Sequence, residues 1–235
     1  TWAMMRVLPW PAGRMSTIVK TKICGLKTPE MVDAAIAGGA DYIGLVHFAK
    51  SPRHVDLALA RALATRARGR TQVVVLLVDP DDALLSAVAD TVKPDLVQLH
   101  GAETPARLAV ARRLAGCPVM KAVKVETAAD AAEALRYRPA ADLVLFDAKA
   151  PKGAALPGGN GFAFDWSALG QVTPKLGRAW MLSGGLTPET VAEAIRSTRA
   201  PAVDVSSGVE TSPGVKSADL IDRFLRAVKT AKQQA

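Results

Sequence analysis

The sequence predicts a single-domain α/β protein, a (β/α)8 TIM barrel, from the number of its short apolar runs and their alternation with helical patterns. Each predicted strand is apolar on both faces, as in a buried parallel sheet. The strands start about 20–37 residues apart, which leaves room for one helix and two loops in each unit. Eight such units in a chain of 235 residues favour the barrel, and a doubly wound open sheet with fewer strands is the alternative. The predicted strands are residues 19–23, 42–46, 72–78, 96–99, 119–123, 143–146, 180–182 and 202–205.

Three of the predicted helices begin in the same way. Thr28, Thr104 and Thr187 each precede a proline and follow a predicted strand. Threonine at an N-cap accepts a hydrogen bond from a backbone N–H that otherwise lacks a partner, and proline suits the first helical position. The pattern Thr-Pro-Glu-x-Val-x-x-Ala-Ile occurs at residues 28–36 and again at 187–195. This recurrence indicates a repeated strand–helix unit.

Two segments fall outside the strand–helix units. Prolines interrupt the apolar residues of segment 1–17, so we interpret it as a poorly ordered N-terminal extension and assign the catalytic barrel to residues 18–235. Residues 149–161 form the longest connection, between the sixth and seventh strands. Long loops in compact domains often act as lids, although a plain surface loop is the alternative. We therefore expect residues 149–161 to cover the active face.

The composition limits the class of partner. Two cysteines are too few for a disulfide framework and indicate a reducing, cytoplasmic location. No apolar run approaches the ~20 residues of a membrane span, and the three histidines share no metal-ligand spacing, so neither membrane nor metal is expected. The net charge is +8, with 11 Lys and Arg against 4 Asp and Glu in residues 1–70. A solvated basic face, an anionic small substrate and nucleic acid remain possible readings, but only 5% of residues are aromatic, which argues against nucleic acid.

Two ionisable residues stand at the carboxyl ends of predicted strands, Cys24 and Asp147. In a barrel these ends meet at one mouth, where the active site lies, so a thiol and a carboxyl could exchange protons with one substrate. Cys24 could be an ordinary buried residue, but its place before Gly25 and a helix start favours a lowered pKa and a reactive thiolate. A carboxylate after an apolar run must be hydrogen-bonded or carry a proton. We interpret Asp204 and Cys117 as structural.

Loops rich in glycine and serine follow the seventh and eighth strands. Each alone is typical of a turn, but barrels commonly bind a substrate phosphate at these two positions, through backbone N–H groups. Arg53, after the second strand, is the candidate for binding a carboxylate, with Lys50 and His54 as weaker candidates. Gln98 and His100 face the same mouth, either as substrate contacts or as polar residues between barrel layers. The predicted phosphate-loop residues are Gly184, Gly185, Ser206, Ser207 and Gly208.

Seven segments, taken in order, resemble the motifs of one enzyme family. They are KICG at 22–25, KSPR at 50–53, QLHG at 98–101, LFD at 145–147, LPGGNG at 156–161 with FDW at 164–166, SGGL at 183–186 and VDVSSGVE at 203–210. Each motif is weak alone, but seven in one order are specific. Over about residues 19–228 the chain resembles phosphoribosylanthranilate isomerase, of tryptophan biosynthesis.

The resemblance implies an Amadori rearrangement of N-(5-phosphoribosyl)anthranilate to 1-(2-carboxyphenylamino)-1-deoxyribulose 5-phosphate, without metal or cofactor. It implies that Asp147 protonates the ribose ring oxygen as general acid and that Cys24 removes the C2 proton as general base. Arg53 would bind the anthranilate carboxylate, and the two glycine-rich loops the phosphate. The expected partner is thus a small phosphosugar, and the sequence leaves open a monomer or a homodimer.

Two other readings compete with this one. A related phosphosugar barrel, the histidine-pathway isomerase, uses paired aspartates, one of them at the end of the first strand, and Cys24 at that position argues against it. A barrel that binds a phosphate ligand or nucleic acid without catalysis would tolerate replacement of Cys24 and Asp147.

Overall fold

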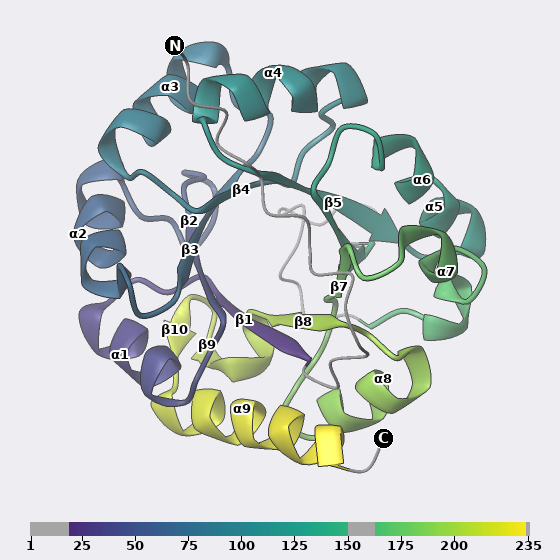
Figure 1. The fold of residues 1–235 in the computed structure, drawn as a ribbon. Helices are drawn as coiled ribbons and strands as arrows, with labels where there is room; N and C mark the ends of the chain where they lie inside the picture. The colour runs from purple at the N-terminus through teal and green to yellow at the C-terminus, as the bar shows by residue number, and fades with distance from the viewer. Residues whose placement is uncertain (1–18, 150–162, 234–235) are drawn as a thin grey trace.

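The computed structural model describes residues 19–149 and 163–233. Eight parallel strands pair in chain order and close into a barrel, because β1 pairs with β8 as well as β2 (Figure 1). The predicted (β/α)8 fold is confirmed, and four of the eight strands have the predicted bounds. The strands are β1 (Lys20–Cys24), β2 (Tyr42–Val46), β3 (Gln72–Leu77), β4 (Leu96–Leu99), β5 (Val119–Val125), β6 (Leu143–Ala148), β7 (Trp180–Leu182) and β8 (Ala202–Val205).

The helices surround the ring of strands (Figure 1). A short hairpin of β9 (Glu210–Ser212) and β10 (Val215–Lys216) follows β8 and precedes the last helix. The described helices are α1 (Pro29–Ala37), α2 (Leu57–Ala67), α3 (Asp82–Thr91), α4 (Pro105–Ala115), α5 (Ala128–Ala132), α6 (Ala134–Tyr137), η1 (Trp166–Leu169), α7 (Thr173–Leu176), α8 (Val191–Thr198), η2 (Ser207–Val209) and α9 (Ala218–Gln233).

Two of the three predicted threonine caps are confirmed. The Thr28 side chain accepts from Met31 N and starts α1, and the Thr104 side chain likewise starts α4. The third prediction was wrong by several residues, since α8 begins only at Val191. There Thr187 N donates to the Thr190 hydroxyl at 3.0 Å, and this local bond forms a turn ahead of the helix.

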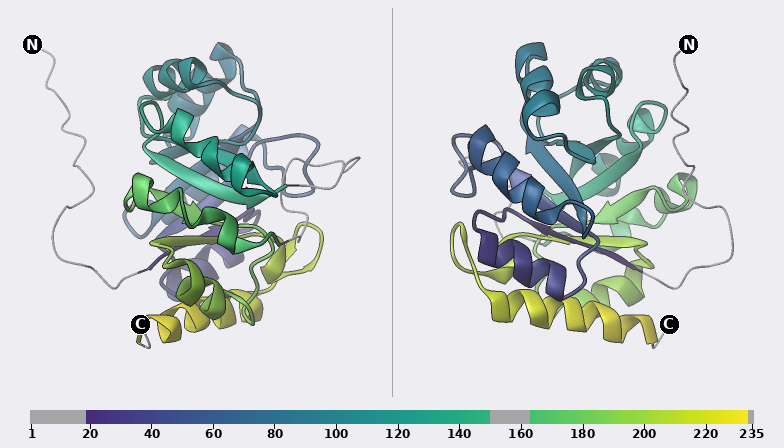
Figure 2. Two further views of the ribbon diagram at one scale, coloured as in Figure 1. Left: turned by 90° about the vertical axis from the view of Figure 1, so that its right-hand side faces the viewer. Right: turned by 60° about the vertical axis from the view of Figure 1, so that its left-hand side comes forward.

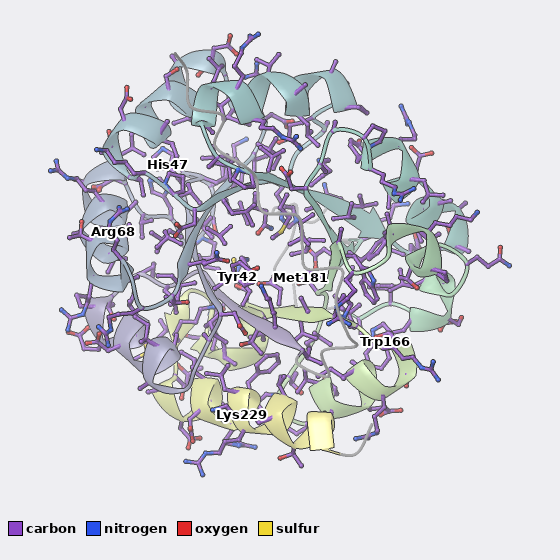
Figure 3. All side chains as sticks on the ribbon, viewed as in Figure 1. Tyr42, His47, Arg68, Trp166, Met181 and Lys229 are labelled. Carbon is purple, nitrogen blue, oxygen red and sulfur yellow. The ribbon has the colours of Figure 1, made fainter. Side chains whose placement is uncertain are left out.

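Side chains alternate between two cores, as the period of a strand requires. The larger core lies between the strands and the surrounding helices. The smaller core fills the barrel itself, and Figure 3 shows two of its members, Tyr42 and Met181, inside the ring of strands. Ala202 on β8, Leu96 on β4 and Leu145 on β6 belong to the same inner core. These residues define which face of each strand points into the barrel.

The β9–β10 hairpin lies at the end of the barrel where the parallel strands finish. In the side views of Figure 2 it projects at the same end as the loop that follows β2. A Cβ built on Gly214 of the hairpin would lie 2.4 Å from Pro52 O of that loop, so the two segments touch.

The predicted extension over 1–17 and residues 150–161 of the predicted lid lie outside the described residues. In the described part of the chain, no helix is both long and apolar enough to cross a membrane.

Candidate active site

The alternation of side chains brings the predicted site residues to one mouth of the barrel. Asp204 follows Ala202 by two positions on β8, and Asp147 follows Leu145 by two on β6, so both point inward at the carboxyl ends of their strands. Gln98 follows Leu96 in the same way on β4. Sequence reasoning thus placed these residues on the correct face.

Cys24 is the last residue of β1 and is buried. Two positions earlier, Lys22 faces the same side of the strand and is fully buried, with Nζ 2.9 Å from Asp204 Oδ1. The second oxygen of Asp204 accepts from the Ser183 hydroxyl at 3.1 Å. A Cβ on Gly44 of the neighbouring strand would lie 2.8 Å from Cys24 Sγ, so only glycine leaves room for the sulfur.

Burial raises the pKa of the Cys24 thiol, although the ammonium groups of Lys22 and Lys216 act in the opposite direction. The expected lowering of this pKa by a helix N-terminus is not found, because α1 starts only at Pro29 and the thiol is desolvated. Burial would also lower the pKa of Lys22, but Asp204 and Cys24 outweigh it and hold that pKa above its usual range.

Arg53 lies across the end of β1, and its guanidinium group is held by the chain itself. A Cβ on Gly25 would lie 2.7 Å from Arg53 Cδ, so Gly25 makes room for the arginine. Arg53 Nε and Nη2 donate to the two carboxylate oxygens of Glu210, at 2.7 and 2.8 Å. Lys216 Nζ contacts the same carboxylate at 2.6 Å. Burial would raise the pKa of Glu210, but these two cations hold it below its ordinary value.

Lys216 connects the Arg53–Glu210 pair to Ser206 and the end of β1. Its Nζ donates to Ser206 O at 2.8 Å, and the Ser206 hydroxyl donates to Cys24 O at 3.3 Å. Burial lowers the pKa of Lys216 despite its contact with Glu210. The side chain of Ser206, which the sequence suggested for phosphate binding, is therefore engaged with the end of β1.

Asp147 lies opposite this network, on β6. Its Oδ1 accepts from Ala148 N at 3.0 Å, and its Oδ2 lies 3.2 Å from His100 Nε2. His100 Nδ1 is 3.0 Å from Gln98 Nε2. The side chains of Gln98, His100 and Asp147 therefore form one chain of contacts from β4 to β6.

Two atoms of this group have no hydrogen-bond partner among the described residues. They are Gln98 Oε1 and His100 Nε2, and both are buried at the mouth. The His100 Nε2 contact with Asp147 is close without hydrogen-bond alignment. Buried polar atoms are normally satisfied, so atoms left without a partner at a barrel mouth indicate a place for a polar ligand.

The loop after β7 packs so closely against β6 and against the loop after β8 that glycine is required at two positions. Gly184 has φ of 89° and Gly185 of 65°, which other residues rarely adopt. A Cβ on Gly184 would lie 2.6 Å from Ala148 N, and one on Gly208 would lie 1.9 Å from Leu186 O. The predicted phosphate loops therefore lie side by side, next to the strand that carries Asp147, with Ser207 at the start of η2.

Some predicted residues lie away from this group, and several site residues were missed. Cys117 precedes β5 at the opposite end of the barrel, as interpreted from the sequence. Lys50 is exposed, and His54 Nδ1 has no hydrogen-bond partner within residues 19–149 and 163–233. Lys22 could have been identified from the sequence, because a lysine inside a buried strand needs a partner and therefore indicates a site residue. No signal in the sequence pairs the hairpin with Arg53. The residues missed are Lys22, Gly44, Glu210 and Lys216.

Comparison with known proteins agrees with this arrangement. The sequence profile described as "N-(5'phosphoribosyl)anthranilate (PRA) isomerase" matches residues 21–227. N-(5'-phosphoribosyl)anthranilate isomerase of Rhodopseudomonas palustris strain BisA53 is 54% identical over 212 residues, which is 90% of this chain and 96% of the relative. The enzyme of the same name from Bradyrhizobium sp. strain ORS 278 is 52% identical, over 93% of this chain and 98% of the relative.

Solved structures give the same result. Phosphoribosyl anthranilate isomerase from Thermotoga maritima is 35% identical, with a TM-score of 0.80, over 91% of this chain and 100% of that one. A further structure is a phosphoribosyl anthranilate isomerase in complex with reduced 1-(o-carboxyphenylamino)-1-deoxyribulose 5-phosphate. It is 34% identical, with a TM-score of 0.77, over 91% of this chain and 100% of that one.

Proposed function

The chain belongs to the N-(5'-phosphoribosyl)anthranilate isomerase family, and we propose that it performs the family's reaction with Asp147 as general acid and Cys24 as general base. The enzyme is an intramolecular oxidoreductase of L-tryptophan biosynthesis. It converts N-(5-phosphoribosyl)anthranilate to 1-(2-carboxyphenylamino)-1-deoxyribulose 5-phosphate.

One observation carries the assignment of roles. A thiol and a carboxyl group face inward at the same mouth, from β1 and β6, and each lies beside a candidate anion site. Arg53 lies over the end of β1, and Gly184 packs against Ala148, the residue after Asp147. A substrate with an anion at each end can be fixed between such sites, which holds its sugar in place for proton transfer.

The reaction then follows in two proton transfers. Asp147 gives a proton to the ribose ring oxygen, the C1–O bond breaks, and the nitrogen lone pair forms a C1=N Schiff base. The deprotonated sulfur of Cys24 takes the C2 proton, and the C–H electron pair forms an enolamine that relaxes to the ketone. Transfers of this kind contribute about 10²–10⁴-fold each.

Different residues would bind the carboxylate, the sugar and the phosphate of the substrate. Glu210 occupies the Nε edge of the Arg53 guanidinium group, so the substrate carboxylate would be bound by an arginine already fixed in direction. Gln98 and His100 supply the unpartnered atoms Oε1 and Nε2 toward the sugar. Gly184, Gly185, Ser207 and Gly208, with the backbone of Ser206, would hold the phosphate through their N–H groups.

The thiols and one related structure bear on location and assembly. Both cysteines, Cys24 and Cys117, are free thiols, which favours a cytoplasmic enzyme. One phosphoribosylanthranilate isomerase structure is described as dimeric, and for this chain a monomer and a homodimer are both consistent with the fold.

The test is direct. N-(5-phosphoribosyl)anthranilate is generated from anthranilate and phosphoribosyl pyrophosphate, and the decay of its fluorescence is followed after addition of the protein. We expect rapid decay with the intact chain and a loss of about 10²-fold or more with Cys24→Ala. Cys117→Ser, which alters the other thiol at the far end of the barrel, serves as the matched control and should stay active. Full activity of Cys24→Ala would favour the non-catalytic reading of the site.

A further inference from the structure

Five buried charged side chains form a cluster on the side of the mouth that holds Cys24, and their charges do not cancel. Within the described residues, cations outnumber carboxylates by one in this cluster. An uncompensated buried charge is costly, and a deprotonated Cys24 sulfur would make the cluster neutral. The cations are Lys22, Arg53 and Lys216, and the carboxylates are Asp204 and Glu210.

Lys22 is the cation placed against the sulfur. It faces the same side of β1 as Cys24, two positions earlier. A Cβ on Gly44 would lie 2.8 Å from Cys24 Sγ and 3.1 Å from Lys22 Nζ, so both atoms face one small space that a glycine leaves open. The Lys22 side chain is fully buried, so water does not screen its charge.

The direction of the Lys22 ammonium group is set by β8. Asp204 Oδ1 accepts from Nζ at 2.9 Å, and the Ser183 hydroxyl fixes the other oxygen of Asp204 at 3.1 Å. The carboxylate therefore cannot turn away without breaking two buried hydrogen bonds. Lys22 is held between a permanent anion and a group that can become one.

We propose that Lys22 is a positioning residue that acts through Cys24: its ammonium group is the counter-ion that stabilises the deprotonated sulfur, and Asp204 holds that ammonium group in place. This rests on the proposed function, in which Cys24 is the base. Lys22 stays protonated throughout and transfers no proton itself. When the C2 proton moves to the sulfur, Lys22 keeps its pairing with Asp204, and release of that proton restores the ion pair with Cys24.

The other charged groups facing Cys24 act with or against Lys22. Burial raises the pKa of the thiol, Lys22 opposes this most strongly, Asp204 adds to the rise, and Lys216 opposes it. Arg53 and Glu210 lie beyond Lys216 and compensate each other through their two hydrogen bonds. A change at Lys22 alone should therefore be visible in the titration of the sulfur.

The experiment titrates Cys24 by its thiolate absorbance near 240 nm in a Cys117→Ser background, where it is the one remaining thiol. We expect Lys22→Met to move the midpoint to higher pH by about one unit or more, as loss of a close opposite charge does. Lys20→Met, which removes a lysine from the same strand further from the mouth, is the matched control and should leave the midpoint in place. An unchanged midpoint in a folded Lys22→Met variant would overturn the proposal.

Loss of Lys22 leaves Asp204 buried without its cation, so the single variant could unfold. The double variant Lys22→Met/Asp204→Asn removes the whole pair and should show a smaller rise of the midpoint, because Asp204 itself raises the pKa of the thiol. The acidic limb of kcat/KM should move with the thiol titration while KM stays constant, whereas a merely structural role would lower activity equally at every pH. The titration needs no turnover, so a shifted midpoint without isomerase activity would support Lys22 and contradict the proposed function instead.

Discussion

The two sides of the barrel mouth differ in how their polar groups are satisfied. On the side of β1 and β8, Lys22 pairs with Asp204 and Arg53 with Glu210. On the side of β4 and β6, atoms of Gln98 and His100 have no partner among the described residues. On the first side the chain itself satisfies the charged groups, whereas on the second side the described residues leave two buried polar atoms for a ligand to bond.

This difference fits the two chemical roles. A buried thiolate is costly, so its surroundings must be built before the substrate arrives. An acid that protonates a ring oxygen needs instead to be open to that oxygen. Among the described residues, Asp147 Oδ2 contacts the imidazole nitrogen of His100 without hydrogen-bond alignment. We infer that the base side is preorganised and that the acid side gains its final hydrogen bonds on substrate binding.

The largest expected effect is that of Asp147→Asn. The amide keeps the shape of the side chain and can still accept from Ala148 N, but it has no proton to give. We expect kcat to fall by about 10²–10⁴-fold, with the melting temperature within a few degrees of the parent. Steady-state kinetics by the fluorescence assay and thermal unfolding by circular dichroism check this. Asp90→Asn on the exposed part of α3 is the control, and near-normal turnover by Asp147→Asn would remove the acid role.

The next effect concerns the preorganised side. Glu210→Gln would replace the carboxylate that aligns Arg53 with a neutral group that cannot accept both hydrogen bonds. Since hydrogen bonds to charged groups contribute about 1.5–3 kcal/mol, KM should rise by roughly 10- to 100-fold. Glu189→Gln, at the exposed pair with Arg223, should leave KM unchanged. A normal KM in Glu210→Gln would mean that Arg53 needs no support or binds no carboxylate.

The sequence predicted the fold well because apolar runs and their spacing report the strands directly. It also predicted which strand ends carry Cys24, Asp147 and His100, because the side-chain period fixes the inward face. The start of α8 was misplaced, since Thr187 binds Thr190 in a local turn and not the helix end. Hydrogen bonds between side chain and backbone favour a turn at this point, and the sequence pattern does not show whether the turn or an earlier helix start is more stable.

The supporting residues of the site could not be predicted in the same way. Glu210 is separated from Arg53 by 157 positions, and nothing local to either residue indicates their pairing. The pKa of Cys24 could not be predicted, because burial, which the sequence does not state, outweighs the nearby cations and raises it. Residue types indicate the chemistry of a site, whereas partners and desolvation come from tertiary packing.

A smaller effect tests the ligand-dependent side. Gln98→Met keeps the volume of the side chain and removes its unpartnered Oε1 together with the contact to His100. One net hydrogen bond to substrate is worth about 0.5–1.5 kcal/mol, so KM or kcat/KM should worsen by roughly 2- to 12-fold. Stability should hardly change, because the lost contact is offset by removal of an unsatisfied buried oxygen. A large loss of stability with unchanged kinetics would instead make Gln98 a structural residue between barrel layers.

The smallest effect uses a third buried pair, outside the barrel mouth, as a reference for the preorganised side. Glu103 Oε2 lies 2.6 Å from Lys121 Nζ, and Glu103 Oε1 accepts from Asp79 N at 2.9 Å. Burial would raise the pKa of Glu103, but Lys121 and these hydrogen bonds hold it below the ordinary value of about 4.5.

A carboxyl group whose pKa is lowered by folding stabilises the protein above its unfolded pKa and loses that contribution as the pH falls through the folded value. The difference in melting temperature between the parent and Glu103→Gln should therefore be constant near neutrality and shrink as the pH drops below about 4.5. Glu193→Gln, on the exposed face of α8, is the control. Lys121 lies between the inward-facing Met120 and Ala122 and so faces the helices, and the pair reaches the mouth only through the backbone of Gly101. KM at neutral pH should therefore change far less than in Glu210→Gln. If Glu103→Gln raised KM as strongly, buried ion pairs would act on activity through general stability, and the contrast between the two sides of the mouth would lose its basis.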